Sequence, residues 1–199
     1  MPLSSHSADA LTLASKQPFA QGNHRQCFAI RERSDLCFKV EMGNYRFYQR
    51  LRSPNVAELR YHKHLRVASV DISALPVSHA HSIQTIDGYR GLLCDLIRDH
   101  DGAISETAKH YARKGMSSGQ MEAIRELYRK IIECRLLIKD PGVGNIVLQD
   151  RGGERWKAVF VDGLGPSTLI PVAQFSRTVQ ERASRAKAVK ILQRLGVDL

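Results

Sequence analysis

Short runs of apolar residues, alternating with polar ones and separated by turn residues, dominate the first half of the chain. This spacing is typical of β-strands, in which successive side chains point to opposite faces of a sheet. Gly22 and Asn23 suit the turn of a first hairpin, and Asp87-Gly88 suits the turn of another. Five strands are therefore predicted before residue 98: a hairpin over residues 19–30, a third strand over 36–40, and a pair over 75–86 and 89–97.

One amphipathic helix is predicted among these strands. Ser53-Pro54 is a typical helix start, with an N-capping residue followed by proline at the first helical position. Beyond it, one helical stripe is formed by Glu58, Tyr61, Leu65 and Ala68. A carboxylate that shares a stripe with Tyr and Leu is buried, and it then needs a cationic partner. Lys39 on the third strand is the candidate; the alternative is that Glu58 lies at the stripe's edge and binds water while Lys39 points to solvent.

The second half of the chain has mainly helical periodicity, with apolar residues recurring every three or four positions. Helices are predicted over 105–114, 118–137 and 174–195, and a short strand pair over 146–149 and 156–161. We therefore expect an α+β fold that forms a single domain over residues 1–199. Its strand-rich half (about 17–97) and its mainly helical half (98–199) are expected to form two lobes around a cleft.

Polar residues that suit phosphoryl transfer stand at the ends of apolar runs in this second half. Asp140 precedes Asn145 by five residues, across a loop with one proline and two glycines, and Asp162 is followed at once by Gly163. In phosphoryl transfer from ATP, one Asp orients the acceptor hydroxyl, while an Asn and a second Asp hold magnesium against the phosphates. The pattern predicts Asp140 as a catalytic residue and Asn145 and Asp162 as ligands of Mg²⁺.

The order of these parts resembles the protein-kinase-like fold: five strands with one helix, a hinge near 95–98, a long helix, an Asp-x-x-x-x-Asn loop, a strand pair and an Asp-Gly turn. The resemblance implies a five-stranded N-lobe and a reduced, mainly helical C-lobe, with ATP and Mg²⁺ as cofactors. Lys39 would neutralise the α- and β-phosphates and Glu58 would hold Lys39, so both join Asp140 in the predicted catalytic set. The residues expected to contact the nucleotide are Gly22, Arg25, Lys39, Asp95, Leu96 and Ile97.

Several further motifs run through the chain. They are Gly22-x-x-Arg25-x-Cys27, Cys37-Phe38-Lys39-Val40, Glu58-Leu59-x-Tyr61-x-x-His64-Leu65, Asp99-x-Asp101-Gly102, Asn145-Ile146 and Asp162-x-x-Gly165-x-Ser167-Thr168-Leu169-Ile170-Pro171. Through them the chain resembles, over nearly its whole length, the PhoP regulatory network protein YrbL family. That resemblance implies a small kinase-like protein of Gram-negative bacteria, linked to PhoP/PhoQ-type regulation. It carries over no substrate.

Three features depart from the wider kinase pattern. The first hairpin has one glycine, Gly22, in place of the G-x-G-x-x-G loop whose backbone amides cradle phosphates. His24 and Arg25 either replace that contact with positive charge or block it, and an ordinary polar hairpin tip is an equally good interpretation. Ile138-Lys139 stands where kinases carry His-Arg before the catalytic Asp. Only 37 residues (163–199) follow Asp162, too few for the large helical substrate lobe of eukaryotic protein kinases.

Composition narrows the compartment and the partners. The net charge of +10 calls for an acidic partner, such as nucleotide phosphate, nucleic acid or an anionic surface. The four cysteines lack metal-ligand spacing, so buried reduced thiols are favoured over disulfides. No apolar run approaches the roughly 20 residues of a membrane span, and residues 1–16 are too polar for a secretion signal. We expect a cytoplasmic protein, for which peripheral contact with an anionic surface stays open.

These observations favour an ATP- and Mg²⁺-dependent phosphotransferase that acts on a small-molecule, envelope-precursor or protein hydroxyl in PhoP-linked regulation. The first alternative is a pseudokinase, which binds nucleotide or a partner and acts as a regulatory module; the single glycine of the first hairpin favours it. The second is a basic nucleic-acid-binding protein. It ranks last, because it rests on charge and the terminal helix alone and lacks interleaved aromatic residues.

Overall fold

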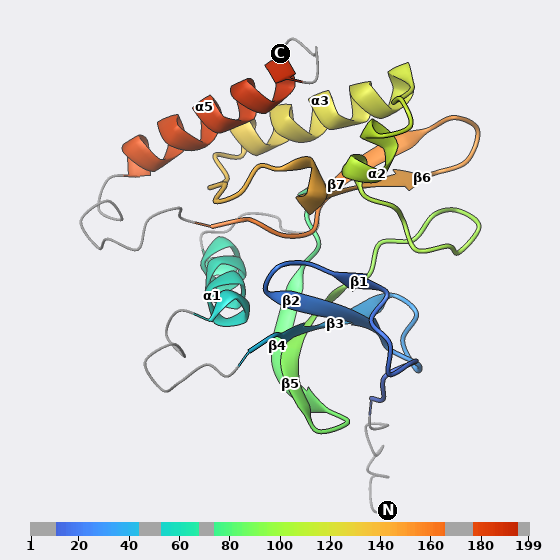
Figure 1. The fold of residues 1–199 in the computed structure, drawn as a ribbon. Coiled ribbons are helices and arrows are strands. Elements are labelled where there is room, and N and C mark those ends of the chain that lie inside the picture. The colour runs from blue at the N-terminus through green and yellow to red at the C-terminus, as the bar shows by residue number, and fades with distance from the viewer. Residues whose placement is uncertain (1–10, 44–52, 68–73, 166–176, 195–199) are drawn as a thin grey trace, which may run out of the picture.

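A five-stranded antiparallel sheet forms the N-terminal part of the molecule (Figure 1). The computed structural model describes residues 11–43, 53–67, 74–165 and 177–194. The sheet has the order β1-β2-β3-β5-β4, and its strands are β1 (Ala20–Gln21), β2 (Arg25–Ala29), β3 (Leu36–Glu41), β4 (Ala80–Ile86) and β5 (Tyr89–Asp95). The five strands predicted before residue 98 are confirmed, although the last two are shorter than predicted.

The central strands β3 and β5 are buried because the sheet carries a hydrophobic core on each face. Phe38 and Leu93, which lie opposite each other, belong to one core, and Cys37 and Cys94 belong to the other. Successive side chains of a strand point to opposite faces. Lys39 therefore lies on the same face as Cys37, so a charged side chain enters a buried environment.

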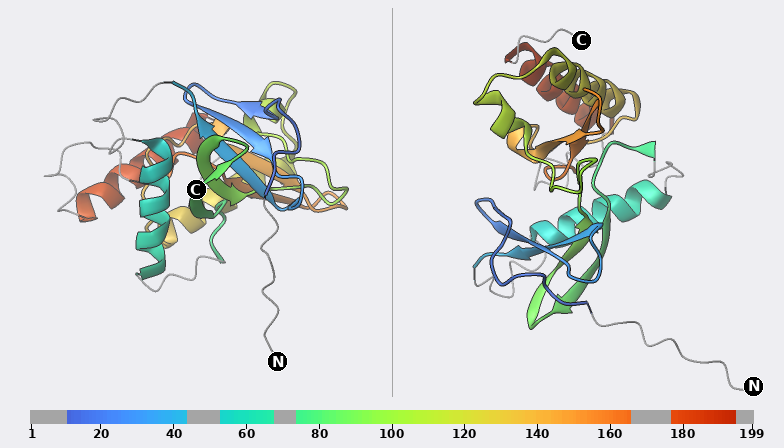
Figure 2. Two further views of the ribbon diagram at one scale, coloured as in Figure 1. Left: turned by 90° about the horizontal axis from the view of Figure 1, so that it is seen from below. Right: turned by 90° about the vertical axis from the view of Figure 1, so that its right-hand side faces the viewer.

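The helix α1 (Pro54–Val67) lies between β3 and β4 in the chain and packs against β3, β4 and β5 (Figure 2). The predicted N-cap is present, because the hydroxyl of Ser53 accepts a hydrogen bond from the N–H of Val56 at 3.2 Å. Tyr61 and Leu65 are buried, and so is Glu58 on the same stripe. The helical stripe predicted from the sequence is thus confirmed up to Leu65, and Ala68 lies outside the described residues.

Helices and a strand pair make up the C-terminal part, above the sheet in Figure 1. Its elements are α2 (Ala108–Ala112), α3 (Ser118–Glu133), the 3₁₀ turn η3 (Val143–Asn145), β6 (Ile146–Asp150), β7 (Trp156–Phe160) and α5 (Arg177–Arg194). The apolar stripe of α3 packs against β7 and α5 in one core that includes Ile124, Tyr128, Phe160 and Leu192. The fold is α+β, and its arrangement is compatible with two lobes.

The segment 75–79, predicted as the beginning of a strand, is not part of the sheet. It crosses to the C-terminal part, where Val77 forms a parallel bridge with Phe160 and the N–H of Ser78 donates to the Phe160 carbonyl at 2.8 Å. Pro76 has no N–H to donate to a strand ladder, and its carbonyl accepts from Phe160. This crossing ties the sheet to the strand pair β6–β7.

Two predicted helices are shorter than expected for backbone reasons. The first covers 108–112 and not 105–114, because Thr107 bridges to Val147 in extended conformation and its hydroxyl caps α2. The second ends at Glu133 and not at 137, because Arg135 has a φ of 53°, which a right-handed helix cannot contain. The residues released from this helix lead directly to Asp140.

All four cysteines are free thiols. Cys37 and Cys94 are buried, as predicted, and burial raises the pKa of the Cys37 thiol to about 12. Cys27 is half-buried and Cys134 at the end of α3 is exposed, so the prediction that all four are buried is wrong for these two residues. The helical stripe of α3 ends there, and the side chain points away from its core.

No helix in the described part of the chain is both long and apolar enough to cross a membrane.

The basic helix α5 fastens the loop that contains Asp140. The Ser184 hydroxyl accepts from the N–H of Ile138 at 3.0 Å, and the Lys187 ammonium donates to the carbonyls of Ile138 and Lys139, both at 3.1 Å. A positive charge directed at backbone carbonyls makes stronger hydrogen bonds than a neutral donor. Part of the basic character of this helix is therefore structural.

Replacing this lysine should loosen the loop. We expect Lys187→Met to lower the free energy of unfolding by about 1–3 kcal/mol, because two charge-assisted hydrogen bonds are lost. Lys190→Met is the matched control: it removes the same charge from an exposed position of the same helix and should change stability by less than about 0.5 kcal/mol. Urea unfolding measures both values. Equal effects of the two substitutions would contradict the role given to Lys187.

Candidate functional site

A buried ion pair joins β3 to α1. Lys39 Nζ lies 2.7 Å from Glu58 Oε1, and only 4% of Lys39 and 7% of Glu58 are exposed. The ammonium also donates to the carbonyl of Val161 at 2.6 Å. The structure therefore contains the Lys39–Glu58 pair predicted from the helical stripe, and excludes the alternative in which both side chains face water. It places this pair directly against the residue that precedes Asp162.

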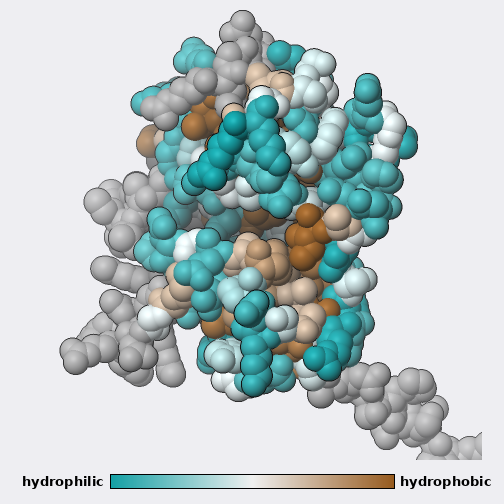
Figure 3. Space-filling view, turned by 45° about the vertical axis from the view of Figure 1, so that its right-hand side comes forward, coloured by the Kyte–Doolittle hydropathy of each residue, from teal (hydrophilic) through white to brown (hydrophobic). Residues whose placement is uncertain are grey.

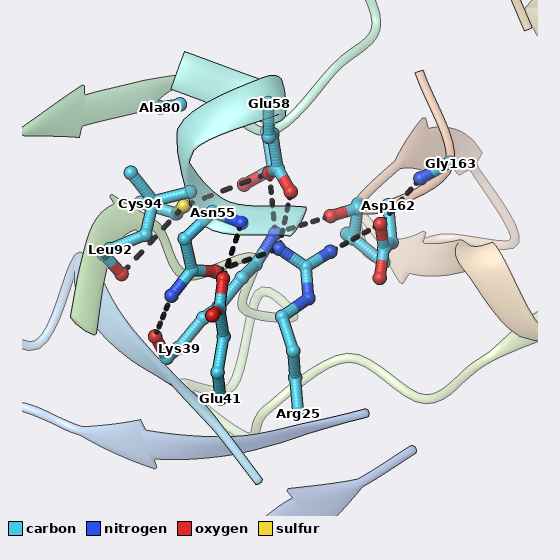
Figure 4. Close-up of polar contacts among 12 residues, drawn as sticks. Arg25, Lys39, Glu41, Asn55, Glu58, Ala80, Leu92, Cys94, Asp162 and Gly163 are labelled. Atoms are coloured by element: carbon cyan, nitrogen blue, oxygen red, sulfur yellow. Dashed lines mark hydrogen bonds and ion pairs between the residues drawn. The ribbon is translucent and has the colours of Figure 1, made fainter. Parts of the chain in front are cut away.

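Arg25 lies between Glu58 and Asp162 (Figure 4). One terminal nitrogen of its guanidinium is 2.6 Å from Glu58 Oε2 and donates to the side-chain oxygen of Asn55 at 3.1 Å. The other terminal nitrogen is ion-paired with Asp162 Oδ1. Arg25 is 6% exposed. The interpretation of this residue as an ordinary polar hairpin tip is thus wrong, because strand β2 turns the side chain inward.

The charges of this cluster compensate one another. Arg25 and Lys39 carry two positive charges, and Glu58 and Asp162 carry two negative charges, so the four side chains are neutral together. Burial by itself would lower the pKa of Arg25, but the nearby carboxylates of Glu58 and Asp162 outweigh burial and raise it. Burial would likewise raise the pKa of Glu58, and Lys39 and Arg25 together hold it below its usual range.

Asp162 is the member of the cluster that solvent reaches. Its side chain is 44% exposed, and its Oδ1 accepts a hydrogen bond from the N–H of Gly163 at 2.6 Å. Burial tends to raise its pKa, but the neighbouring charges of Arg25 and Lys39 lower it below the ordinary value. The carboxylate is therefore ionised at neutral pH, and a ligand can reach it.

Asp140 and Asn145 lie on a loop that is bonded to the Asp162-Gly163 turn. The N–H of Asp140 donates to the carbonyl of Gly163 at 3.0 Å, and the N–H of Val161 donates to the carbonyl of Asn145 at 2.8 Å. The Asn145 amide donates to the Asp140 carbonyl at 3.1 Å. Asp140 is exposed, and its Oδ1 accepts from the N–H of Gly142 at 3.1 Å. The predicted catalytic and metal-binding residues are therefore neighbours, although Asp162 follows Asp140 by 22 positions in the sequence.

Two buried tyrosines hold this loop from other elements. The Tyr128 hydroxyl of α3 donates to the carbonyl of Pro141 at 2.6 Å. The Tyr61 hydroxyl of α1 accepts from the N–H of Leu137 at 2.7 Å. Burial raises the pKa of Tyr128, and the nearby charge of Asp140 raises it further. Helices from both parts of the molecule thus fix the backbone around Asp140.

The donor atoms at this turn suit magnesium in kind. Asp162 Oδ2 and the side-chain oxygen of Asn145 have no hydrogen bond within the described chain, and both are hard oxygen donors. The described residues contain no cluster of three or more His, Cys, Asp or Glu side chains able to hold a metal. Magnesium commonly binds through one or two protein oxygens together with phosphates and water, so Asp162 and Asn145 fit it as part of a nucleotide complex.

The predicted hinge residues are largely occupied by contacts within the chain. The carboxylate of Asp95 is 2.8 Å from His79 Nδ1 and 2.6 Å from His81 Nε2, and its backbone N–H and carbonyl bond to neighbouring residues. Burial opposes ionisation, but the contacts with His79 and His81 lower the pKa of Asp95 to about 2. The N–H of Leu96 donates to the carbonyl of Asp35 at 2.8 Å. These contacts give Asp95 a structural role, and its contact with a nucleotide stays a prediction.

One peptide group of the hinge stays open for a ligand. The Leu96 carbonyl and the Ile97 N–H make no hydrogen bond within the described chain, whereas the Ile97 carbonyl accepts from Ser105 at 3.1 Å. The two open atoms belong to the same planar peptide and point in opposite directions, so only one of them can face a given edge of a base.

Gly22, the predicted phosphate-contacting glycine of the first hairpin, is exposed. Its N–H bonds to the Arg25 carbonyl at 2.9 Å, and its φ does not require glycine.

Some residues of the site escaped the sequence interpretation. Asn55 donates to the Lys39 carbonyl at 2.9 Å and accepts from Arg25, so it aligns both cations. The sequence offers one signal for this role, which is that Asn55 directly follows the helix start Ser53-Pro54. A residue in the first turn of α1 lies close to strand β3 and can reach its backbone. Tyr61, Ser184 and Lys187 reach the loop from helices that are distant in sequence. The sequence marks Tyr61 only as part of an apolar stripe, and no local pattern indicates any of these three contacts.

Two comparisons with known proteins bear on this site. A model of the family described as PhoP regulatory network protein YrbL matches residues 11–196. The chain is similar to the Uncharacterized protein YrbL of Escherichia coli (strain K12), with 27% identity over 175 residues that cover 84% of this chain and 79% of the relative. The protein of the same name from Shigella flexneri matches with the same identity and coverage. The family match includes every residue of the site described above.

Gly163 should tolerate no side chain. Its φ is +84°, and a Cβ atom would lie 2.4 Å from the Asp140 carbonyl oxygen, which is backbone and cannot move aside. We expect Gly163→Ala to lower the free energy of unfolding by more than the about 1–3 kcal/mol that a left-handed backbone alone costs. Gly115→Ala is the control, because Gly115 has a φ of +88° and open space around it. Chemical denaturation compares them, and equal losses would rule out the close contact.

Proposed function

The chain belongs to the PhoP regulatory network protein YrbL family, and from that premise and the geometry of the site we propose that it is a phosphotransferase that uses ATP. The observation that carries the proposal is the convergence of four separate sequence motifs. The buried Lys39–Glu58 pair lies against the Val161 carbonyl, beside Asp162, and the loop of Asp140 is bonded to the same turn. These are the parts that phosphoryl transfer needs.

Each side chain has a role that its surroundings support. The Lys39 ammonium has three donors, two of which bind Glu58 and Val161, so one remains for a phosphate oxygen. Glu58 keeps the ammonium charged and in place. Asp140 is exposed beside the turn, and its carboxylate can orient an acceptor hydroxyl. Where magnesium accompanies the nucleotide, Asp162 and Asn145 would hold it, and it would neutralise charge that develops on the phosphates.

Apolar side chains at the predicted hinge would suit the base of a nucleotide. On the face seen in Figure 3, apolar side chains gather in the middle of the molecule, and smaller apolar areas show among the hydrophilic side chains above and below. Leu96, at the end of β5, packs against the core that contains Cys37 and Leu92. A mostly apolar surface with few polar groups is the usual environment of a purine base.

The proposal includes the arrangement as two lobes of the protein-kinase-like type. The N-lobe would comprise the sheet and α1, and the C-lobe the helices α2, α3 and α5 with the β6–β7 pair. The acceptor would be a hydroxyl of a small molecule, an envelope precursor or a compact protein, within PhoP-linked regulation. The basic composition of the chain suits the phosphates of ATP.

A pseudokinase is the second candidate, and one observation favours it. The Asp162 carboxylate, which should face metal in an active enzyme, is already ion-paired with Arg25. A chain whose own side chain neutralises this carboxylate could bind nucleotide as a signal without transferring phosphate. Nucleotide binding is common to both candidates, and transfer separates them.

Nucleotide binding should depend on Lys39. We expect Lys39→Met to weaken ATP binding about tenfold or more, since a charge-assisted contact with phosphate is lost. The fold should survive, because Glu58 keeps Arg25 as its partner. Lys63→Met, an exposed position of α1, is the control and should bind ATP as the wild type does. Calorimetry on proteins with unchanged circular dichroism gives the answer, and unaltered affinity in Lys39→Met would refute the assignment.

Phosphate transfer should depend on Asp140. We expect Asp140→Asn to retain ATP binding but to lose about 10²–10⁴ in rate, the usual contribution of a general base. Incubation with labelled ATP, followed by analysis of the protein, envelope fractions and free phosphate, measures transfer. Asp101→Asn is the control, because Asp101 is exposed and its carboxylate accepts the same type of hydrogen bond, from the N–H two residues later. If the wild type binds ATP but labels no acceptor, the pseudokinase candidate is favoured.

A further inference from the structure

The Arg25 guanidinium is paired with the Asp162 carboxylate, where a bound metal ion would otherwise supply the positive charge. We propose that the Arg25 guanidinium is a built-in substitute for a divalent metal ion, so that this chain holds the phosphates of a nucleoside triphosphate with little dependence on Mg²⁺. The part of this inference that concerns nucleotide rests on the proposed function. The Arg25–Asp162 pair exists without nucleotide, so its effect on metal binding can be tested on the free protein.

The position of the guanidinium is built by the surrounding structure. It contacts Glu58, Asn55 and Asp162, and Asn55 is itself fixed by donating to the Lys39 carbonyl. The start of α1 is held in turn by Glu41, whose carboxylate accepts from the N–H of Asn55 at 2.8 Å. A surface arginine samples many rotamers, whereas this one is 6% exposed and bound at three acceptors. Its place beside Asp162 is therefore a constant feature of the free site.

The charge balance explains why metal should bind poorly to the free protein. With Arg25 in place, the cluster of Arg25, Lys39, Glu58 and Asp162 is neutral. A divalent cation that approached Asp162 would meet a carboxylate already neutralised, with a positive guanidinium beside it. Without Arg25, Glu58 would still be paired with Lys39, but Asp162 would be an unpaired carboxylate next to the free amide oxygen of Asn145. That arrangement attracts a hard cation.

The guanidinium can also do for phosphate what the metal does. Arg carries five N–H donors, of which three bind Asn55, Glu58 and Asp162. The remaining donors, on the second terminal nitrogen and on Nε, can take two phosphate oxygens in the fork geometry that arginine favours. Because arginine stays protonated throughout the physiological range, this contact needs neither free metal nor a particular pH.

The first experiment compares ATP affinity in Mg²⁺ with affinity in EDTA. We expect the wild type to differ by less than about threefold between the two conditions, and Arg25→Met to lose at least about tenfold in EDTA relative to Mg²⁺, because its phosphate contact then depends on metal. Arg33→Met, which removes an exposed arginine paired with Asp35, should behave as the wild type does. A wild type that loses more than about tenfold in EDTA overturns the proposal.

The second experiment titrates Mn²⁺ into the protein without nucleotide. We expect Arg25→Met to bind Mn²⁺ at least about tenfold more tightly than the wild type, and Arg25→Met with Asp162→Asn to lose that gain. Equal Mn²⁺ affinity of the wild type and Arg25→Met overturns the proposal. Arg25→Gln, which keeps an amide donor for Glu58, serves if the methionine variant does not fold. Failure to bind ATP under any condition would refute the proposed function and leave this titration to decide the role of Arg25.

Discussion

The Glu58 carboxylate, shared by two buried cations, is the interaction on which the site depends. Its two oxygens bind Lys39 of β3 and Arg25 of β2, so one side chain of α1 fixes two neighbouring strands. A buried carboxylate is costly unless its charge is compensated, and here the compensation is complete. Arg25 and Lys39 then extend the contact to Asp162 and Val161, which belong to the C-terminal part. The strands β2 and β3, the helix α1 and the Asp162 turn are thereby linked by one network of ion pairs and hydrogen bonds.

Backbone hydrogen bonds give the neighbouring loop its own rigidity. The loop of Asp140 and the Asp162-Gly163 turn exchange bonds in both directions, and the absence of a side chain at Gly163 lets them approach each other. Side chains from α1, α3 and α5 hold the flanks of this loop. An exposed carboxylate such as Asp140 is thus carried on a backbone that is restrained from three sides, which is a requirement for orienting a reactant.

Residues whose structural surroundings follow from a local pattern were predictable from the sequence. The position of Glu58 on an apolar stripe indicated a buried partner, and the Asp140 and Asp162 turns lie at the ends of apolar runs. The inward turn of Arg25 was not predictable, because a hairpin tip offers the same residues to solvent and to the interior. The contacts of Ser184 and Lys187 depend on how α5 packs, and a helix with basic residues around it does not reveal which one faces a carbonyl. The path of 75–79 depends on Pro76 and on the distant strand that ends at Phe160, and periodicity does not detect such a partner.

The helix α1 carries both Glu58 and Tyr61, one turn apart on the same face. The first holds the ammonium of Lys39, and the second accepts from the backbone just before Asp140. A rotation or translation of α1 would consequently change the ion pair with Lys39 and the hydrogen bond from Leu137 together. The position of the Lys39 ammonium and the backbone before Asp140 thus both depend on one helix, so a partner that moved α1 would change both at the same time.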